Sequence, residues 1–338
     1  MINSGDLGIV AIGRNEGAHL RGCLESCIAQ TRQVVYVDSG SSDDSPKIAE
    51  GLGVAVVALD ESQPFSAARA RNEGFAHLRA AFPSIQFIQF IDGDCIMAED
   101  WCQASAAKMH DCPDTAIICG RLREKHPEAS IYNRLCDLEW NQPAGETEST
   151  GGIFMVRAKT FAAVEGFNTS VVAGEEPEMC LRIRRLGYKI LRISEDMAWH
   201  DAAMTSFGQW FRRAVRSGHA YAQGAALHGL GREKYCLREC ARIWLWALVI
   251  PILITTLAIF VSEWFALGIL LYAASTWRTA RAARHWVDRR QDAWIFATAC
   301  AIAKFPQLVG QWIFITRALR GKGPTIIEHK SAPGAPEA

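Results

Sequence analysis

The sequence carries no excess of either charge and lacks the paired cysteine spacings that hold zinc or redox centres. Lysine and arginine total 36 in the 338 residues, and aspartate and glutamate also total 36. Because a protein that binds a polyphosphate backbone usually has a basic excess, nucleic acid is not expected as a partner. The eleven cysteines are scattered along the chain, and they are interpreted as small buried hydrophobic side chains in a reducing compartment.

Signals for secretion and for common nucleotide sites are also missing. Residues 1–6 are polar and the apolar stretch that follows is only one strand long, so no signal peptide is expected. No G-x-G-x-x-G follows an expected strand, and no G-x-x-x-x-G-K-[ST] occurs. These absences argue against a nicotinamide, flavin or P-loop site.

The C-terminal part, in contrast, is rich in long apolar runs. Residues 243–261 are nineteen positions without a charge, close to the roughly 20 that a helix needs to span a bilayer. A second uncharged run covers 264–277. A third run, 293–316, is interrupted by Lys304 and Pro306, and we therefore interpret it as an interfacial or re-entrant helix.

These runs and the charges between them predict membrane-associated helices at 236–322 and a flexible tail at 323–338. Residues 278–290 hold five arginines and one aspartate, and basic loops stay on the cytoplasmic side of a membrane. We therefore expect a hairpin at about 243–277, with the N-terminal domain on the cytoplasmic side of the inner (plasma) membrane. The alternative is a buried helical subdomain of a soluble enzyme.

Residues 1–235 predict a soluble α/β domain, because short apolar strands alternate with helical patterns. Polar residues gather directly after three of the strands, at 14–16, at 38–43 and at 92–94. Since ligands of open α/β sheets bind at the carboxyl ends of the strands, the three clusters together outline one site. The two aspartates of 92–94 can share a Mg²⁺ or Mn²⁺ ion with phosphate oxygens. Each cluster alone would also be typical of a turn or a helix cap.

The segment 174–188 predicts a helix with an acidic start, because a proline lies in its first turn and a glycine at its end. Glu175, Glu176 and Glu178 crowd the positive end of the helix dipole, which tends to keep them ionised. They are candidates for catalytic carboxylates, and the alternative is an ordinary acidic helix start. Upstream, the glycines of 150–152 either let the backbone approach an acceptor or form a plain turn.

Together these segments resemble the family-2 glycosyltransferases with the GT-A fold, over roughly residues 7–230. The resemblance implies an α/β fold with a GT-A-type, Rossmann-like mixed sheet flanked by helices, followed here by a C-terminal helical membrane region. It also implies a nucleotide-sugar donor, a divalent cation (Mn²⁺ or Mg²⁺) and transfer with inversion. The matching motifs are I-G-R-N-E (12–16), V-D-S-G-S-S-D (37–43), A-R-N-E-G (70–74), D-G-D (92–94) and the block at 174–188.

The resemblance further implies roles for individual residues. Asp94 matches the usual metal ligand, and Asp92 helps to hold the nucleotide and the metal. His200 matches a histidine that reaches the metal or the diphosphate, and the alternative is a structural histidine. Glu176 takes the position of the general base, where the family usually has aspartate, and Glu175 orients the site beside it. That departure leaves the choice among the three glutamates of the block open. The expected donor-binding residues are Arg14, Asn15, Glu16, Asp38, Arg71, Asn72 and Asp92.

We therefore expect a membrane-attached enzyme that transfers a sugar, from a UDP-linked donor, to a lipid-linked glycan or other membrane-associated acceptor in cell-surface polysaccharide or glycolipid synthesis. Two alternatives stay open. A non-catalytic membrane scaffold of the same fold is disfavoured by the intact Asp92 and Asp94. A nucleotidyltransferase would share a nucleotide site at the sheet edge, but the loop at 13–16 is a poor version of the glycine-rich and basic phosphate loop that such enzymes use.

Overall fold

The computed structural model describes residues 5–321, and the chain divides into two compact units. Residues 203–235, which the sequence predicted to belong with the catalytic domain, group with the C-terminal helices. The tail predicted at 323–338 lies outside the described residues. The first unit, here called the sheet unit, comprises Met1–Lys125, Trp140–Ser170 and Glu175–Ala202, and the second, the helical unit, comprises His126–Glu139, Val171–Gly174 and Ala203–Ala338.

The sheet unit is built on a mixed sheet with the order β3-β2-β1-β4-β8-β6-β9-β5, in which β7 pairs with β9. The strands β3, β2, β1 and β4 run parallel, and β8 is antiparallel to β4. The strands β1, β2 and β4 are buried almost along their whole length, as expected for strands covered on both faces. The strands are β1 (Leu7–Gly13), β2 (Val34–Asp38), β3 (Ala55–Ala58), β4 (Phe87–Asp92), β5 (Cys95–Met97), β6 (Thr115–Glu124), β7 (Gly145–Glu146), β8 (Phe154–Arg157) and β9 (Lys189–His200).

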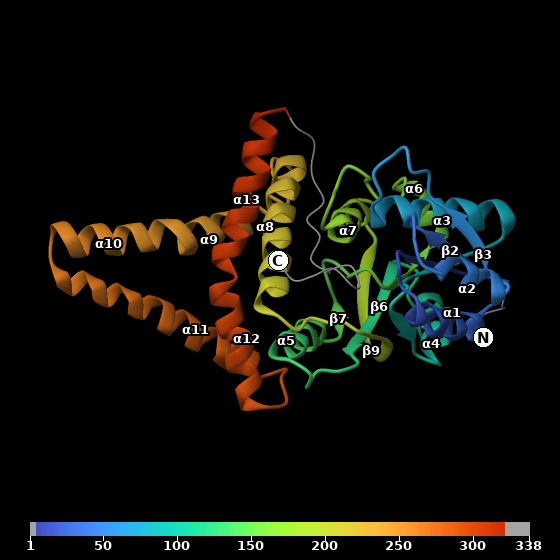
Figure 1. The fold of residues 1–338 in the computed structure, drawn as a ribbon, viewed down its shortest axis with the longest axis horizontal. Helices are drawn as coiled ribbons and strands as arrows, with labels where there is room; N and C mark the ends of the chain where they lie inside the picture. The colour runs from blue at the N-terminus through green and yellow to red at the C-terminus, as the bar shows by residue number, and fades with distance from the viewer. Residues whose placement is uncertain (1–4, 322–338) are drawn as a thin grey trace. The chain divides into compact units, whose positions relative to one another are not determined.

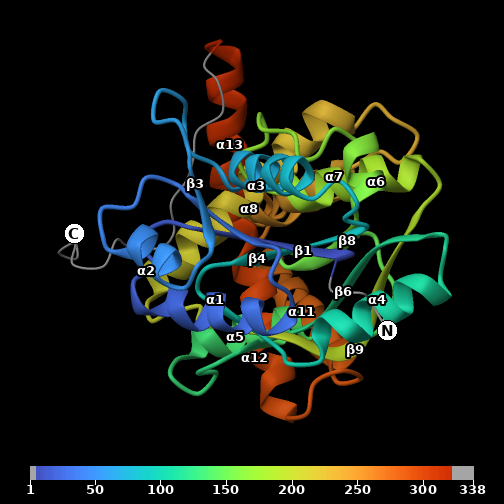
Figure 2. The same cartoon turned by 90° about the vertical axis from the view of Figure 1, so that its right-hand side faces the viewer.

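Helices cover both faces of this sheet, with α3, α6 and α7 on one face and α1 and α4 on the other (Figure 2). Ser66 caps α3, because its hydroxyl oxygen accepts a hydrogen bond from the backbone N–H of Arg69 at 3.2 Å. The predicted fold class, a mixed α/β sheet flanked by helices, is confirmed. The helices of the unit are α1 (Ala18–Gln30), α2 (Ser45–Gly51), α3 (Ala67–Ala81), α4 (Trp101–Asp111), α6 (Ala158–Ala163) and α7 (Glu175–Arg185).

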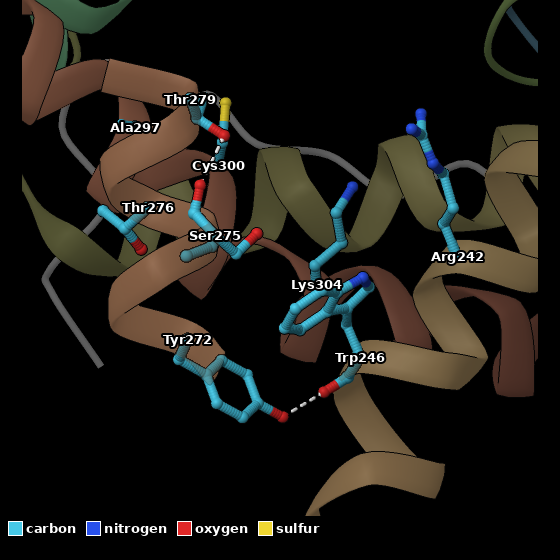
Figure 3. A pocket seen from close by; sticks show the side chains of 10 residues that line it. Arg242, Trp246, Tyr272, Ser275, Thr276, Thr279, Ala297, Cys300 and Lys304 are labelled. Atoms are coloured by element: carbon cyan, nitrogen blue, oxygen red, sulfur yellow. Dashed lines mark hydrogen bonds between the residues drawn. The ribbon is translucent and has the colours of Figure 1, made fainter. Parts of the chain in front are cut away.

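The helical unit contains two helices that are long and apolar enough to cross a membrane, Leu237–Phe260 and Arg290–Leu319. The first combines α9, the π-helical segment η1 and α10. The second combines α12 and α13. A cavity of about 250 Å³ lies among α9, η1, α11, α12 and α13 (Figure 3). The elements of the unit are α5 (Ile131–Trp140), α8 (Phe207–His228), α9 (Leu237–Trp244), η1 (Leu245–Val249), α10 (Ile250–Phe260), the 3₁₀ segment η2 (Glu263–Ile269), α11 (Leu270–Ala283), α12 (Arg290–Ile302) and α13 (Lys304–Leu319).

The helix α10 packs against η2, and α10 and α11 form the two arms of a hairpin (Figure 1). No residue of α10 is buried. Since monomeric soluble proteins rarely expose a contiguous apolar surface of this kind, the hairpin has the surface of a membrane or protein contact. Its exposed large apolar side chains include Val249, Ile252, Leu253, Ile259, Phe260, Trp264, Phe265, Leu267, Ile269, Leu270 and Leu271.

The third apolar run forms a helix of spanning length, whereas the sequence favoured an interfacial or re-entrant segment. Its place in or on a membrane stays a prediction. Within the unit, α13 crosses α8 at very short range (Figure 1). A Cβ atom on Gly218 would lie 1.9 Å from the carbonyl oxygen of Gln307, and one on Gly310 would lie 1.9 Å from that of Val215. Glycine at both positions is therefore what lets the two backbones approach.

Candidate active site

The three polar loops predicted to share a site do lie together, because the strands that precede them end at the same edge of the sheet. Gly13 at the end of β1 pairs with Asp38 at the end of β2, and Ile12 pairs with Asp92 at the end of β4. The first two loops are also joined by hydrogen bonds. The backbone N–H of Asn15 donates to the Ser41 hydroxyl at 2.9 Å.

Further hydrogen bonds hold residues 14–16, the polar loop that follows β1. The side-chain oxygen of Asn15 accepts from the backbone N–H of Ser42 at 2.7 Å, and the N–H of Glu16 donates to the Ser45 hydroxyl at 3.1 Å. Arg14 is exposed, with its guanidinium 5.6 Å from the ring centre of Phe65. Asn15 and Glu16 thus fix the loops, while Arg14 is accessible to a ligand.

Asp38 is buried and orders its own loop. Its carboxylate accepts hydrogen bonds from the N–H groups of Gly40 and Ser41 at 3.1 and 2.8 Å, and from the hydroxyls of Ser41 and Tyr36 at 2.5 and 3.1 Å. Burial and the neighbouring Asp38 charge raise the pKa of Tyr36. In this structure the Asp38 carboxylate orders the loop that follows β2. Its expected contact with a nucleotide base stays a prediction.

Asn72, also expected to bind the donor, joins α3 to the loop before α7. Its side-chain amide donates to the carbonyl of Phe167 at 2.8 Å, and its side-chain oxygen accepts from the N–H of Phe167 at 2.9 Å. Phe167 packs in turn against Phe90 and Phe161 in the aromatic core. A donor contact of Asn72 stays a prediction, since both ends of its amide are engaged with backbone here.

Arg71 collects three carboxylates around one buried guanidinium. Its side chain is only 3% exposed, and it lies 2.9 Å from Asp92, 3.3 Å from Glu175 and 3.0 Å from Glu176. The planar fork of arginine suits such multiple contacts with carboxylates. Arg71 thus connects the aspartate at the end of β4 with the acidic start of α7, and its expected contact with the donor stays a prediction.

One cation facing three carboxylates leaves an excess of negative charge, and this affects Glu176. Burial and the neighbouring Glu175 carboxylate raise the pKa of Glu176 to about 7, against the opposing effect of the Arg71 guanidinium. A carboxylate whose pKa lies near neutral pH is suited to accept a proton during a reaction. The residue that the resemblance placed at the general-base position therefore has the electrostatics of a base.

Glu178, the third glutamate of the block, is engaged elsewhere. Both of its carboxylate oxygens accept hydrogen bonds from the Arg182 guanidinium at 2.8–3.0 Å. Arg182 also donates to the backbone carbonyls of Val164 and Gly166. Glu178 thus holds α7 against the loop that follows α6, whereas the carboxylates of Glu175 and Glu176 both contact Arg71.

Gly152 brings backbone directly onto the group of charges around Arg71. A Cβ atom at this position would lie 2.5 Å from the Arg71 guanidinium, 3.0 Å from the Asp92 carboxylate and 3.3 Å from the Glu176 carboxylate. The adjacent Gly151 has no atom within 4 Å of its virtual Cβ. The backbone at Gly152 therefore lies directly against these three side chains, and an approach of this segment to the acceptor stays a prediction.

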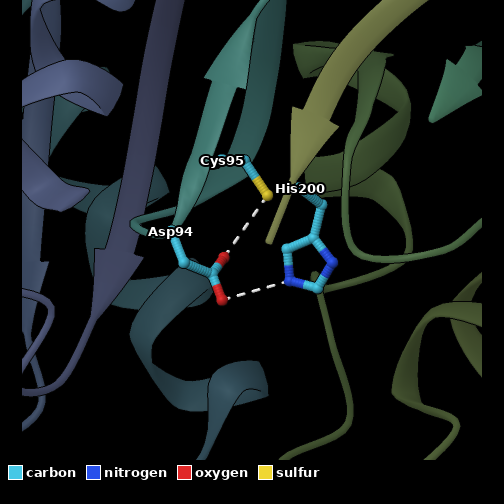
Figure 4. Close-up of side chains that lie close together, drawn as sticks. All are labelled: Asp94, Cys95 and His200. Atoms are coloured by element: carbon cyan, nitrogen blue, oxygen red, sulfur yellow. Dashed lines mark hydrogen bonds and ion pairs between the residues drawn. The ribbon is translucent and has the colours of Figure 1, made fainter. Parts of the chain in front are cut away.

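Asp94 and His200 meet at the end of the sheet, together with Cys95 (Figure 4). A carboxylate oxygen of Asp94 lies 3.1 Å from Nε2 of His200, and the other lies 3.3 Å from Sγ of Cys95. Cys95 on β5 and His200 on β9 are paired residues of adjacent strands, so their side chains share one face of the sheet. The structure thus brings together two of the three predicted metal ligands.

The donor set of this cluster fits a divalent cation. The candidate ligand atoms of the three residues all lie within 4.8 Å of one another. The carboxylate of Asp94 suits Mn²⁺ or Mg²⁺, whereas the sulfur of Cys95 is a soft ligand that suits Zn²⁺ better. Cys95, which directly follows D-G-D, was missed because all cysteines were interpreted as hydrophobic core. Asp92, predicted as a further ligand, is bound to Arg71 and lies outside the Asp94–Cys95–His200 cluster of the described residues.

Comparisons with known proteins agree with this geometry. Residues 9–162 match the family described as glycosyl transferase family 2. The O-antigen chain rhamnosyltransferase WbaN of Salmonella anatum is 22% identical over 202 residues, which cover 56% of this chain and 62% of that protein. The chain therefore matches less than two thirds of that relative's length.

Solved structures share the fold at low identity. The mannosyltransferase PcManGT from Pyrobaculum calidifontis, solved in complex with GDP-Man and Mn²⁺, matches with a TM-score of 0.60 and 17% identity, covering 91% of this chain and 87% of that one. Residues 1–349 of S. aureus TarS match with a TM-score of 0.50 and 13% identity, covering 87% and 90%. The match to glycosyl transferase family 2 thus covers most of the sheet unit, residues 9–162, and the likeness to solved structures shows a GT-A-type fold.

Proposed function

We propose that this protein is an inverting, metal-dependent glycosyltransferase that moves a sugar from a nucleotide-sugar donor to a lipid-linked glycan or other membrane-associated acceptor in cell-surface polysaccharide or glycolipid synthesis. The observation that carries the proposal is the Arg71 bridge. It holds Asp92 of the D-G-D motif and Glu176, the carboxylate with a pKa of about 7, on one guanidinium.

In such a transfer the acceptor hydroxyl oxygen attacks the anomeric carbon of the donor sugar from the face opposite the diphosphate. The bond between that carbon and the diphosphate oxygen breaks, and the nucleoside diphosphate leaves with the electron pair. The proton of the hydroxyl passes to the Glu176 carboxylate, which Glu175 and Arg71 orient. Asp94, Cys95 and His200 would hold the divalent cation, which when bound supplies positive charge to the leaving diphosphate.

The donor would lie along the loops that follow β1, β2 and β4. Asp38 and Arg14 are the proposed contacts to its nucleotide part, with Asn15 and Glu16 fixing the loop between them. The GDP-Man and Mn²⁺ of the mannosyltransferase neighbour support a nucleotide-sugar donor and a divalent cation. A UDP-linked sugar is our expectation for this chain.

The acceptor side of the proposal comes from the helical unit. Two helices of spanning length and an exposed apolar hairpin support membrane attachment. The rhamnosyltransferase relative, by its name, acts on an O-antigen chain. The arginines of 278–290 support a cytoplasmic catalytic side. A cysteine introduced at Ser262, in the hairpin tip, should then react with an impermeant reagent on intact cells.

The proposal is tested with the purified full-length protein in detergent and Mn²⁺. A panel of UDP-, GDP- and dTDP-sugars is offered, and release of free nucleoside diphosphate is measured, with Asp94→Ala as the inactive control. We expect release from one donor or a small set of donors. Pyrophosphate release from a nucleoside triphosphate and a sugar phosphate would indicate a nucleotidyltransferase, and no turnover of any donor would indicate a scaffold.

A further inference from the structure

The cavity among the helices of the helical unit is lined by two cationic side chains, although the helices around it are largely apolar. Arg242 of α9 and Lys304 at the start of α13 both line it, and no aspartate or glutamate does among the described residues. Both cations lie in helices that are long and apolar enough to cross a membrane. A charge in such a segment is costly, so it is usually paired or functional.

Neither cation forms an ion pair in the described part of the chain, although the Glu239 carboxylate of α9 interacts electrostatically with Lys304. Arg242 makes no ion pair or hydrogen bond there, and the one contact of the Lys304 ammonium is with the side-chain oxygen of Gln307 at 3.4 Å. Glu239, one turn before Arg242 on α9, forms no ion pair with it. Other arginines of the same unit do have partners, such as Arg134 with Asp292. Among the described residues, two cations line the cavity and Glu239 is the carboxylate that acts on Lys304, so a net positive charge remains for an anionic ligand.

The opposite wall offers hydroxyl donors and an aromatic surface. Ser275 and Thr276 of α11 face the cavity, and Figure 3 shows Lys304 between Ser275 and Trp246. The Tyr272 hydroxyl donates to the backbone carbonyl of Trp246, and the two rings lie 5.3 Å apart, which fixes α11 against η1. Two cations with neighbouring hydroxyl groups form a donor set suited to the oxygens of a phosphate group.

The position of the cavity indicates the source of that phosphate. Arg242 lies in the second turn of the helix Leu237–Phe260, and Ser275 and Thr276 lie in the second half of the arm that η2 and α11 form together. Because α9–α10 and η2–α11 are the two arms of one hairpin, these residues belong to its base, away from the tip at 262–263. The base is also the end that carries the arginine-rich segment 278–290, where anionic lipid headgroups would gather.

We propose that the cavity lined by Arg242 and Lys304, here called the Arg242–Lys304 pocket, binds the phosphate group of an anionic membrane lipid. Its volume of about 250 Å³ is several times the roughly 30 Å³ that one water occupies, so a headgroup phosphate fits with its glycerol. The inference rests on the proposed membrane attachment and not on glycosyl transfer. It concerns a site in the helical unit that the donor chemistry does not use.

The test measures lipid binding to the full-length protein in detergent by native mass spectrometry, with phosphatidylglycerol as the anionic probe and phosphatidylcholine as the zwitterionic one. The double variant Arg242→Gln/Lys304→Gln should weaken phosphatidylglycerol binding about tenfold or more, because charge-assisted hydrogen bonds are lost. The matched control Arg238→Gln/Arg278→Gln removes the same charge from positions on α9 and α11 that do not line the cavity and should change binding less than about twofold.

Each other outcome has a definite meaning. Equal loss in both double variants would show a diffuse basic surface and overturn the pocket. Displacement of the bound lipid by low concentrations of inorganic phosphate would show a site for free phosphate instead. Failure of the wild-type protein to float with phosphatidylcholine vesicles would overturn membrane attachment and this proposal with it. Nucleoside diphosphate release by the pocket variant should match wild type, which shows that the chain is folded and keeps the two proposals separate.

Discussion

The replacement Glu176→Gln tests the assignment of the base most directly. It keeps the size and hydrogen-bonding capacity of the side chain but removes its ability to take a proton. Because a positioned base contributes about 10²–10⁴-fold to rate, turnover should fall by that factor. Donor affinity should change little, since Glu176 contacts Arg71 rather than the loops after β1 and β2.

The pH dependence follows from the raised pKa of Glu176. The carboxyl must be ionised to act as a base, and with a pKa of about 7 only about one tenth of it is ionised at pH 6. The wild-type kcat/KM should therefore rise through pH 7, and Glu176→Gln should remove this limb of the profile. The folded-state pKa lies above the usual glutamate value of 4.5, so ionisation of Glu176 costs stability. The contribution of Glu176 to the free energy of unfolding is greatest below about pH 4.5 and is lost as the pH rises towards 7. The free energy of unfolding of Glu176→Gln should therefore fall less than that of the wild type between these two pH values.

The assay is nucleoside diphosphate release with donor affinity measured separately, and Glu178→Gln is the matched control. Glu178 pairs with Arg182 and supports α7. Its replacement should therefore lower the melting temperature and leave the turnover rate of the folded enzyme nearly unchanged. An inactive but fully folded Glu178→Gln beside an active Glu176→Gln would refute the assignment. So would a Glu176→Gln enzyme that keeps the wild-type pH profile.

Three further predictions concern other parts of the structure. Gly152→Ala should lower turnover at least tenfold, because its Cβ would lie 2.5 Å from the Arg71 guanidinium. Gly151→Ala should have near wild-type turnover, because no atom lies within 4 Å of its Cβ position. Equal kinetics for the two variants would contradict the close approach at Gly152. Asp94→Ala, or excess EDTA, should abolish nucleoside diphosphate release, and isothermal titration with Mn²⁺ should show weaker binding by Asp94→Ala; full activity in EDTA would exclude metal dependence. Gly310→Val should destabilise the helical unit by about 1–3 kcal/mol or more in thermal unfolding, because its Cβ would overlap α8, while Gly208→Ala, whose virtual Cβ makes ordinary contacts, should unfold like wild type.

The sequence by itself determined the features that depend on short stretches of chain. Continuous apolar runs gave the buried strands β1, β2 and β4, and polar residues directly after them could only lie at one edge of the sheet. The sequence also predicted the acidic first turn of α7, because its three glutamates lie within four positions. The apolar runs of the hairpin were also identified from the sequence, because their length alone predicts membrane-associated helices.

Only the tertiary structure decided which of the polar side chains act on one another. Arg71 and Glu175 are separated by 104 positions and Asp94 and His200 by 106, so no local pattern can show that they touch. Cys95 became a candidate ligand only when β5 paired with β9 and set it beside His200. Hydrogen bonds and ion pairs depend on distances of about 3 Å, and such distances between remote residues are fixed by sheet register and helix packing.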